Sequence, residues 1–323
     1  MALLEVSALV TEFHTAAGVV RALDRVSFSL ERGKVLAIVG ESGSGKSVTA
    51  FSLMNLLDHP GRIASGEIVF RGEDLRSATE SRWRALRGDR MAMVFQDPMM
   101  SLNPVMRIGD QLAETVAIHH RNSRNEVNGQ VEEALRKVGI AAPRERMRAY
   151  PHELSGGMRQ RVAIANAIIN RPDLIIADEP TTALDVTIQA QILYEMKQLV
   201  QTSGTALIWI THDIGVVKDL ADEVCVMYAG RVIEQGLVAD VLASPRHPYT
   251  RGLIDSLPNA GAAGARGRRL YSIPGSTPPL LALPPGCTFA PRCSRAAPLC
   301  ATVPPAAIEG ERAFRCFYPL EVA

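Results

Sequence analysis

One short segment, GESGSGKS at residues 40–47, constrains the fold of this chain more than any other part of its sequence. It follows the pattern G-x-x-x-x-G-K-S, and it lies between the apolar run VLAIV and the helix-forming segment KSVTAFSLMNLL. A glycine-rich loop between a buried strand and a helix presents its backbone N–H groups to a phosphate. The sequence therefore predicts a phosphate-binding loop. An incidental glycine turn is the alternative, which this flanking context disfavours.

The residues of this loop suit the chemistry of a bound nucleotide. The backbone N–H groups of residues 43–47 are expected to surround the β-phosphate, and the Lys46 ammonium group to reach the β- and γ-phosphates. The Ser47 hydroxyl is expected to ligate magnesium. The predicted nucleotide contacts in this part of the chain are Gly40, Ser42, Gly43, Ser44, Gly45, Lys46, Ser47 and Val48.

Short apolar runs bounded by polar turns recur along the chain. Continuous apolarity is typical of strands buried on both faces, and the segments between the runs have helical spacing, so we expect a parallel α/β sheet. Three earlier segments alternate like antiparallel strands, which predicts an N-terminal β subdomain. Polar, helical residues 97–157 predict a helical insertion. The apolar runs are residues 35–40, 91–95, 174–178, 205–210 and 223–230, and the alternating segments are 5–13, 22–35 and 66–75.

Polar side chains follow three of the predicted strands. Asp178 and Glu179 end the run LIIADE, Gln96 follows MAMVF and His212 follows TALIWIT. Ligands of parallel sheets bind at the carboxyl ends of the strands, where these residues are expected to lie. We expect Ser47, Gln96 and Asp178 to hold magnesium, Glu179 to orient the attacking water, and His212 to contact the γ-phosphate or that water. A solvated acidic pair and ordinary polar strand ends are the alternatives.

A second candidate anion site occurs in LSGGMRQR at residues 154–161. Ser155 can cap a helix, and Gly156 and Gly157 would let a phosphate approach bare backbone N–H groups. One nucleotide needs a single phosphate loop, so this second site has no phosphate of its own on the same chain.

Composition limits the classes of partner. The 35 Lys and Arg residues balance 34 Asp and Glu residues, and a net charge of +1 argues against nucleic acid as the partner. No window approaches the 18 or so consecutive apolar residues of a membrane span, and residues 1–14 lack the plan of a signal peptide. We expect a cytosolic chain.

In their order, these motifs resemble those of the nucleotide-binding subunits of ATP-binding cassette (ABC) transporters over residues 3–240. GESGSGKS, FQDP, LSGGMRQR, LIIADE, ALD and THD look like the Walker A loop, Q-loop, signature, Walker B strand, D-loop and switch-histidine loop. The resemblance implies a P-loop NTPase with a RecA-like parallel sheet core, and it adds Asp185 of the D-loop to the site. It also implies that Phe13 stacks on adenine, with a β-strand core residue as the alternative.

The resemblance gives the second anion site a function. In this family two cassettes meet head to tail, and each ATP lies between the Walker A loop of one and the signature of the other. It implies an ATPase subunit with Mg²⁺ and ATP, a second ABC ATPase subunit that forms a heterodimer with it, two membrane permease subunits and an extracytoplasmic solute-binding protein. It also implies peripheral attachment to the cytoplasmic face of the bacterial inner membrane.

Beyond residue 240 the composition shifts to Pro, Gly, Ala and Arg, which predicts a linker and a C-terminal extension over residues 241–323. HPYTRGLIDSLP, IPGSTPP and GCTFAPRCSRAAPLC resemble the extension of dipeptide and oligopeptide importers. Nickel, glutathione and some sugar importers share these features. A soluble ABC ATPase acting on nucleic acid or ribosomes and a P-loop kinase are rivals, but this chain has neither two cassettes nor a coiled-coil insertion, and a kinase would leave the signature idle.

Four of the five cysteines lie in this extension, with the spacing Cys-x5-Cys-x6-Cys-x15-Cys. Four thiolates can hold zinc or an iron–sulfur cluster, and the short knuckles typical of structural zinc are absent. Resemblance to similar extensions implies a 4Fe-4S cluster on Cys287, Cys293, Cys300 and Cys316. Zinc and reduced, unligated thiols remain the alternatives. Cys225 lies in an apolar run and is expected to be a core residue.

Overall fold

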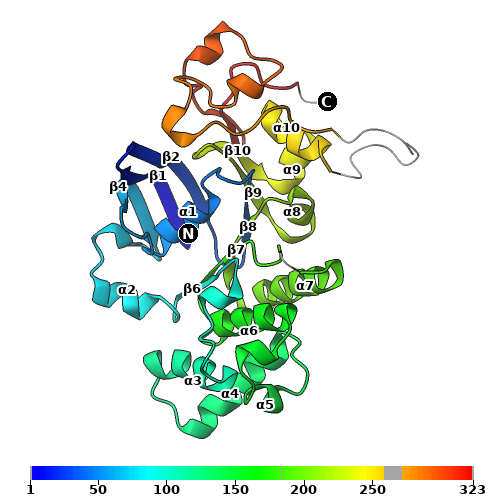
Figure 1. Ribbon diagram of the computed structural model, residues 1–323. Helices are drawn as coiled ribbons and strands as arrows, with labels where there is room; N and C mark the ends of the chain where they lie inside the picture. The colour runs from blue at the N-terminus through cyan, green and yellow to red at the C-terminus, as the bar shows by residue number, and fades with distance from the viewer. Residues whose placement is uncertain (1, 183, 258–270, 322–323) are drawn as a thin grey trace, which may run out of the picture. The chain divides into compact units, whose positions relative to one another are not determined.

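The computed structural model describes residues 2–182, 184–257 and 271–321, which are drawn in colour in Figure 1. The chain divides into two compact units. Unit 1 comprises Met1–Leu30, Val35–Arg76 and Ile210–Ala323, and unit 2 comprises Glu31–Lys34 and Ser77–Trp209. Residues 258–270, within the predicted linker and extension, and Ala183 of the predicted D-loop lie outside the described residues.

Unit 1 contains a four-stranded antiparallel sheet in the order β2-β1-β4-β5. Leu4 in β1 pairs with Leu30 in β2 and with Phe70 in β4, and all three side chains are buried. Alternating apolar residues thus cover one face, as the sequence predicts. The strands are β1 (Leu4–Thr15), β2 (Gly18–Leu30), β4 (Gly61–Phe70) and β5 (Glu73–Asp74).

A second set of strands in unit 1 runs in the order β11-β12-β10-β9-β3. β3 (Val35–Val39) pairs in parallel with β9 (Glu223–Tyr228), and every residue of β3 is buried. This confirms the prediction from its continuous apolar run. β10 (Arg231–Leu237) pairs antiparallel with β9 on one side and with β12 on the other.

The helices of unit 1 are α1 (Lys46–Leu53), α8 (Ile214–Leu220), α9 (Val238–Ala243) and α10 (Pro248–Asp255). The helical spacing of KSVTAFSLMNLL predicts a longer α1, to residue 57. The helix ends at Leu53 because Asn55 adopts a left-handed φ of 48°, which no α-helix can continue through.

Unit 2 holds β6 (Met91–Val94) and β7 (Leu174–Asp178), which pair in parallel, and residues 206–209 of β8 (Ala206–Thr211), the next strand in order beside β7. The predicted helical insertion is confirmed. Ser123 and Glu126 form a capping box that starts α4, and Gly139, with φ 70°, follows its end. The helices are α2 (Glu80–Leu86), α3 (Ile108–His119), α4 (Arg124–Lys137), α5 (Pro143–Arg146), α6 (Gly156–Ile168) and α7 (Val186–Ser203).

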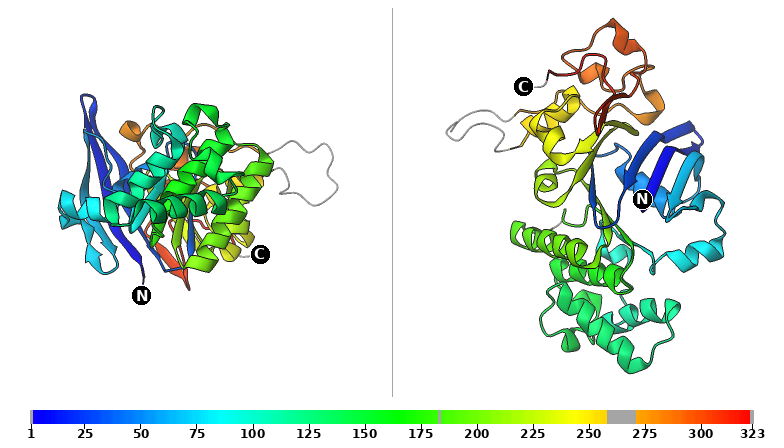
Figure 2. Two further views of the ribbon diagram at one scale, coloured as in Figure 1. Left: turned by 90° about the horizontal axis from the view of Figure 1, so that it is seen from below. Right: turned by 180° about the vertical axis from the view of Figure 1, so that it is seen from behind.

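The C-terminal extension joins the sheet and the core of unit 1. Its hairpin, β11 (Ala307–Glu309) and β12 (Arg312–Phe314), adds to β10, as the red strand of Figure 2 shows. Phe289 is 3% exposed and packs edge-on against Tyr228 and Tyr249 at 5.3 Å between ring centroids. Residues on both sides of the predicted boundary at 240 therefore share one core. Short 3-10 turns η4 (Leu280–Ala282), η5 (Ala290–Arg292) and η6 (Pro298–Ala301) complete the extension.

Among the residues that the structure describes, no helix combines the length and the apolarity that a membrane crossing requires.

Candidate active site

The predicted phosphate loop joins β3 to α1 in unit 1, which is the strand–loop–helix context that its sequence predicts. Gly43 and Gly45 have left-handed φ values of 77° and 103°. A Cβ at Gly45 would lie 2.9 Å from the Ala22 carbonyl oxygen, so the turn requires glycine there. The loop places the N-terminus of α1, the positive end of the helix dipole, beside residues 40–45, an arrangement that favours an anion.

The Lys46 side chain is held within this loop. It is 5% exposed, and its Nζ donates hydrogen bonds to the carbonyl oxygens of Gly40 at 2.9 Å and Glu41 at 3.1 Å. These contacts keep the ammonium group beside the backbone N–H groups that are predicted to bind phosphate. Ser47 is half-buried in the first turn of α1. The loop therefore concentrates positive charge at one place.

The acidic pair lies at the end of β7 in unit 2. Asp178 is the last residue of the strand and is 3% exposed, while Glu179 adopts a left-handed φ of 44°. Such a backbone is strained for glutamate and persists where the surrounding structure enforces it, often at functional sites. Glu179 Oε2 accepts hydrogen bonds from Thr182 Oγ1 at 3.0 Å and from Gln96 Nε2 at 3.4 Å.

These contacts bring together two of the three residues predicted to be catalytic. Gln96 and Glu179 follow β6 and β7, neighbouring parallel strands whose carboxyl ends meet at one edge. No motif in the sequence points to Thr182, because a threonine near an acidic pair carries no signal of its own. Its hydroxyl fixes the Glu179 carboxylate.

The signature segment starts α6. Ser155 is the N-cap, and its Oγ accepts a hydrogen bond from the Met158 N–H at 3.3 Å, which confirms the predicted capping. Ser155 and Gly156 are exposed, and a Cβ built on Gly156 meets no described atom within 4 Å. The first turn of α6 is therefore open to a group from another molecule. Asp185 caps α7 in the same way, because its Oδ1 accepts from the Ile188 N–H at 3.0 Å.

A buried arginine fixes the orientation of α6 within unit 2. Arg161 is 5% exposed, and its Nη1 donates to the Val138 carbonyl oxygen at 2.7 Å and to Glu195 Oε1 at 3.1 Å. Its Nη2 donates to Gln191 Oε1 at 2.5 Å. One guanidinium group thus ties the signature helix both to the helical insertion and to α7.

Two further predicted residues lie in unit 1. His212 follows β8 and is exposed, and Asp213 beside it caps α8 by accepting from the Gly215 N–H at 2.8 Å. Phe13 lies in β1, half-buried and paired with Gly61 of β4. A Cβ at Gly61 would lie 2.7 Å from Phe13 Cε1, so glycine leaves room for the ring. Stacking of Phe13 on adenine stays a prediction.

Comparison with known proteins decides the family. Residues 23–182 match the family described as ABC transporter, and residues 233–300 match the oligopeptide/dipeptide transporter C-terminal region. The oligopeptide transport ATP-binding protein OppD of Salmonella typhimurium is 48% identical over 320 residues, 99% of this chain and 94% of that protein. The chain belongs to the ABC transporter family. OppD of Bacillus subtilis is 50% identical over 91% of this chain and 82% of that protein.

Solved structures of ABC proteins have the same fold. A dimeric ATP-binding cassette bound to ADP and Pi in a post-hydrolysis state aligns with a TM-score of 0.67 and 25% identity, covering 73% of this chain and 98% of that one. CbiO1 of Clostridium perfringens, part of an ABC transporter complex, aligns with a TM-score of 0.64 and 30% identity over 75% of this chain and 91% of that one. The ABC chain described here is thus an ATP-binding subunit and an ATPase.

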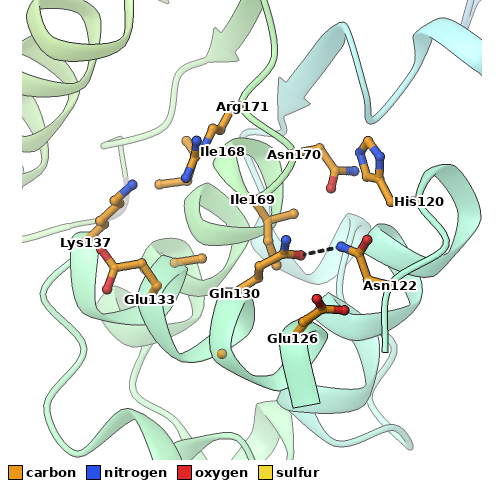
Figure 3. Close-up of a pocket in the computed structure, with 12 residues that line it drawn as sticks. His120, Asn122, Glu126, Gln130, Glu133, Lys137, Ile168, Ile169, Asn170 and Arg171 are labelled. Atoms are coloured by element: carbon orange, nitrogen blue, oxygen red, sulfur yellow. Dashed lines mark hydrogen bonds between the residues drawn. The ribbon is translucent and has the colours of Figure 1, made fainter. Parts of the chain in front are cut away.

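The ABC subunit also has a pocket in unit 2 that none of the predicted site residues line, shown in Figure 3. It lies between α4 and the chain that follows α6, and Asn122 Nδ2 donates to Gln130 Oε1 across one end at 3.4 Å. Its lining carries two carboxylates, Glu126 and Glu133, and two cationic side chains, Lys137 and Arg171.

The four cysteines of the extension line one cavity, together with His247 and Phe289. Burial raises the pKa of Cys287 and Cys293, and it raises that of Cys316 to about 11, so these thiols are protonated at neutral pH unless a metal displaces the proton. Burial lowers the pKa of His247 to about 3, and its Nδ1 accepts from the Tyr249 N–H at 3.0 Å.

The geometry of these thiols is not that of a formed metal site. Within the described ranges, no three His, Cys, Asp or Glu side chains are arranged to hold a metal ion. The cavity therefore supports the clustering of Cys287, Cys293, Cys300 and Cys316 but leaves the predicted 4Fe-4S cluster without direct support. Cys225 is 2% exposed in β9, and its Sγ lies 3.5 Å from Gln235 Oε1. It is a core residue, as predicted.

Proposed function

We propose that this ABC subunit binds MgATP at residues 40–47 and hydrolyses it to drive the import of peptides across a membrane. The observation that carries the proposal is the match at 48% identity to an oligopeptide transport ATP-binding protein along almost the whole chain, extension included. The motif residues supply the chemistry for ATP hydrolysis. The extension supplies the link to peptide cargo, because it matches a transporter subgroup rather than ABC proteins in general.

Each motif has one role in the proposed site. Lys46 and the N–H groups of residues 43–47 bind the phosphates, and the side chains of Ser47, Gln96 and Asp178 hold magnesium, which neutralises phosphate charge when bound. Glu179 orients and polarises the attacking water. His212 contacts the γ-phosphate or that water.

The site is completed by a second ABC ATPase subunit. Ser155, Gly156 and Gly157 bind the ATP held by the partner, and the partner's signature binds the ATP held by this chain. The exposed, open first turn of α6 supports this arrangement. A paralogous subunit is the proposed partner, which makes the pair a heterodimer, and Asp185 lies at its interface.

The complete transporter also contains two membrane permease subunits and an extracytoplasmic solute-binding protein. No membrane-crossing helix occurs among the described residues, so transport requires the permeases. Attachment to them places this chain peripherally on the cytoplasmic face of a bacterial inner membrane. The charge balance does not favour nucleic acid as a partner.

Reconstitution tests the cargo. The full chain, purified with its permeases and partner subunit, is placed in proteoliposomes with the solute-binding protein and a radiolabelled tripeptide. We expect uptake of the labelled tripeptide in the presence of ATP and none when ADP is supplied in its place. Unlabelled nickel, glutathione and tetrapeptide serve as competitors. Competition by glutathione or nickel but not by the tetrapeptide would transfer the assignment to those solutes, which importers with similar extensions carry.

For the cysteine cavity we propose a 4Fe-4S cluster on Cys287, Cys293, Cys300 and Cys316. The donor set fits, because four thiols from three parts of the extension line one cavity and four cysteine thiolates are the ordinary ligands of such a cluster. The raised pKa values mean that ligation must displace protons, so binding weakens as the pH falls. When bound, the cluster cross-links the extension.

Metal analysis of anaerobically purified full-length chain checks this proposal. We expect about four iron and four acid-labile sulfide per chain, and Cys293→Ser should lose most of both. Cys225→Ser is the matched control, because Cys225 lies in the core away from the cavity and should leave the iron content unchanged. Zinc without iron, or equal iron in both variants, would show that these cysteines do not hold a 4Fe-4S cluster.

A further inference from the structure

The phosphate loop contains a carboxylate, Glu41, whose presence there needs a physical explanation. A negative charge beside a site for polyphosphate opposes binding unless a cation neutralises it. Hydrogen bonding from Arg292 lowers the pKa of Glu41, so the side chain is ionised. Its partner belongs to the C-terminal extension, 251 positions along the chain.

Arg292 binds Glu41 through both terminal nitrogens. Nη1 lies 2.5 Å from Oε2 and Nη2 lies 3.0 Å from Oε1, and the arginine is 8% exposed. A bidentate, charge-assisted pair of this kind is among the strongest polar contacts in proteins. Thr277 Oγ1 donates a further hydrogen bond to Glu41 Oε2 at 3.0 Å. The Glu41 backbone is also held, because its N–H donates to Tyr249 Oη at 2.8 Å.

The rest of the extension fixes the Arg292 guanidinium group. Its Nε donates to the Pro274 carbonyl oxygen at 2.8 Å, and Nη1 donates to Tyr228 Oη at 3.3 Å. The guanidinium carbon lies 5.8 Å from the Tyr228 ring centroid and 5.9 Å from that of Phe289. Arg292 is therefore set in place by the same aromatic core that joins the extension to unit 1.

The Glu41–Arg292 pair lies next to Lys46, the lysine that is expected to bind phosphate. Lys46 Nζ donates to the carbonyl oxygen of Glu41, and its positive charge contributes to the lowered pKa of the Glu41 carboxyl. Without Arg292, the Glu41 carboxylate would compete with the nucleotide phosphates for Lys46 and would repel them directly.

We propose that Arg292 is a positioning residue for ATP: it holds residues 40–41 of the phosphate loop and cancels the charge of Glu41, so that the extension is a working part of the nucleotide site. This inference rests on the proposed function, in which residues 40–47 bind ATP. Arg292 itself does not touch the nucleotide. It acts through Glu41 and, beyond it, on Lys46 and the loop backbone.

Nucleotide titration of the full chain tests the proposal. Isothermal titration with magnesium and a non-hydrolysable ATP analogue is compared between the parent and Arg292→Gln, which keeps hydrogen-bonding groups and removes the charge. We expect the Kd to rise at least about tenfold. Arg292→Lys, which keeps the charge but not the bidentate geometry, should give an intermediate value. If Arg292→Gln does not fold, the Kd of Arg292→Lys is compared with that of the parent instead.

A matched control separates this role from general support of the extension. Arg312 is also a buried arginine of the extension, 9% exposed and paired with Glu234, and neither residue contacts the phosphate loop. Arg312→Gln should lower the thermal unfolding temperature and leave the Kd within about twofold of the parent, provided that binding is measured where both proteins are folded. An equal rise in Kd for Arg292→Gln and Arg312→Gln would show that Arg292 only stabilises the folded extension, and it would overturn the proposal.

The double variant Glu41→Gln/Arg292→Gln tests charge cancellation directly. Because both charges are gone, we expect the Kd to return to within about threefold of the parent. An unchanged Kd in Arg292→Gln, with the parent binding normally, would also overturn the inference. Failure of the parent to bind the analogue would instead overturn the proposed function and this inference with it.

Discussion

We expect Glu179→Gln to slow ATP turnover by the assembled transporter severely while leaving ATP binding intact. Glutamine keeps the size of the side chain, and its amide oxygen can still accept from Thr182, so the strained backbone at Glu179 has the same local support. It cannot take a proton from the attacking water. General-base contributions of this kind are about 10²–10⁴-fold, so the rate should fall by that factor.

Phosphate release and nucleotide titration on the same preparation check this result. In the presence of ATP the variant should accumulate as a closed pair with its partner subunit, which size-exclusion chromatography detects. Thr182→Ala removes one hydrogen bond to Glu179 Oε2 and keeps the carboxylate, so its ATPase rate should fall less than that of Glu179→Gln. Turnover at the parental rate in Glu179→Gln would show that another group orients the water.

Gly156→Phe should spare ATP binding at this chain's own loop and stop hydrolysis of the ATP held by the partner subunit. A Cβ at Gly156 meets no described neighbour within 4 Å, so the larger side chain should not disturb the fold of this chain. It would instead occupy the space before the first turn of α6, where we propose that the partner's phosphates lie.

The assembled transporter with one altered subunit provides the measurement. We expect hydrolysis of the ATP held by the partner subunit to fall at least about tenfold, as for removal of a charge-stabilising group, with nucleotide affinity of the isolated chain unchanged. Gly129→Phe is the matched control, since Gly129 also lies in a helix of unit 2 with no described atom within 4 Å of a Cβ. Parental activity in Gly156→Phe would argue against a site shared between subunits.

The sequence was informative where a motif is local. The glycines of residues 40–47, the acidic end of β7 and the Ser155 cap each depend on a few consecutive residues, and each occupies the element that the sequence predicts. The length of α1 was predicted wrongly, because helical spacing continued past Leu53 while Asn55 took a left-handed backbone. Apolar periodicity carries little information about such a single-residue turn.

The same limit applies to the extension. Its composition suggested a separate C-terminal piece, yet Phe289 lies in the core of unit 1 and β12 pairs with β10. The spacing of the four cysteines is visible in the sequence, but their common cavity could not be predicted from it. Cys316 lies in that cavity because the β11–β12 hairpin brings the chain back toward the other three cysteines.

By itself, then, the sequence determined the loop, the strands that carry the acidic pair, the signature cap and the family, because these follow from contiguous residues whose chemistry needs only local backbone geometry. The tertiary structure alone decided which distant groups meet. Arg292 neutralises Glu41 although 251 positions separate them, because the aromatic core of Tyr228, Tyr249 and Phe289 brings the extension to the phosphate loop. A buried charge is stable only beside its counter-charge, and that pairing is a property of packing in three dimensions.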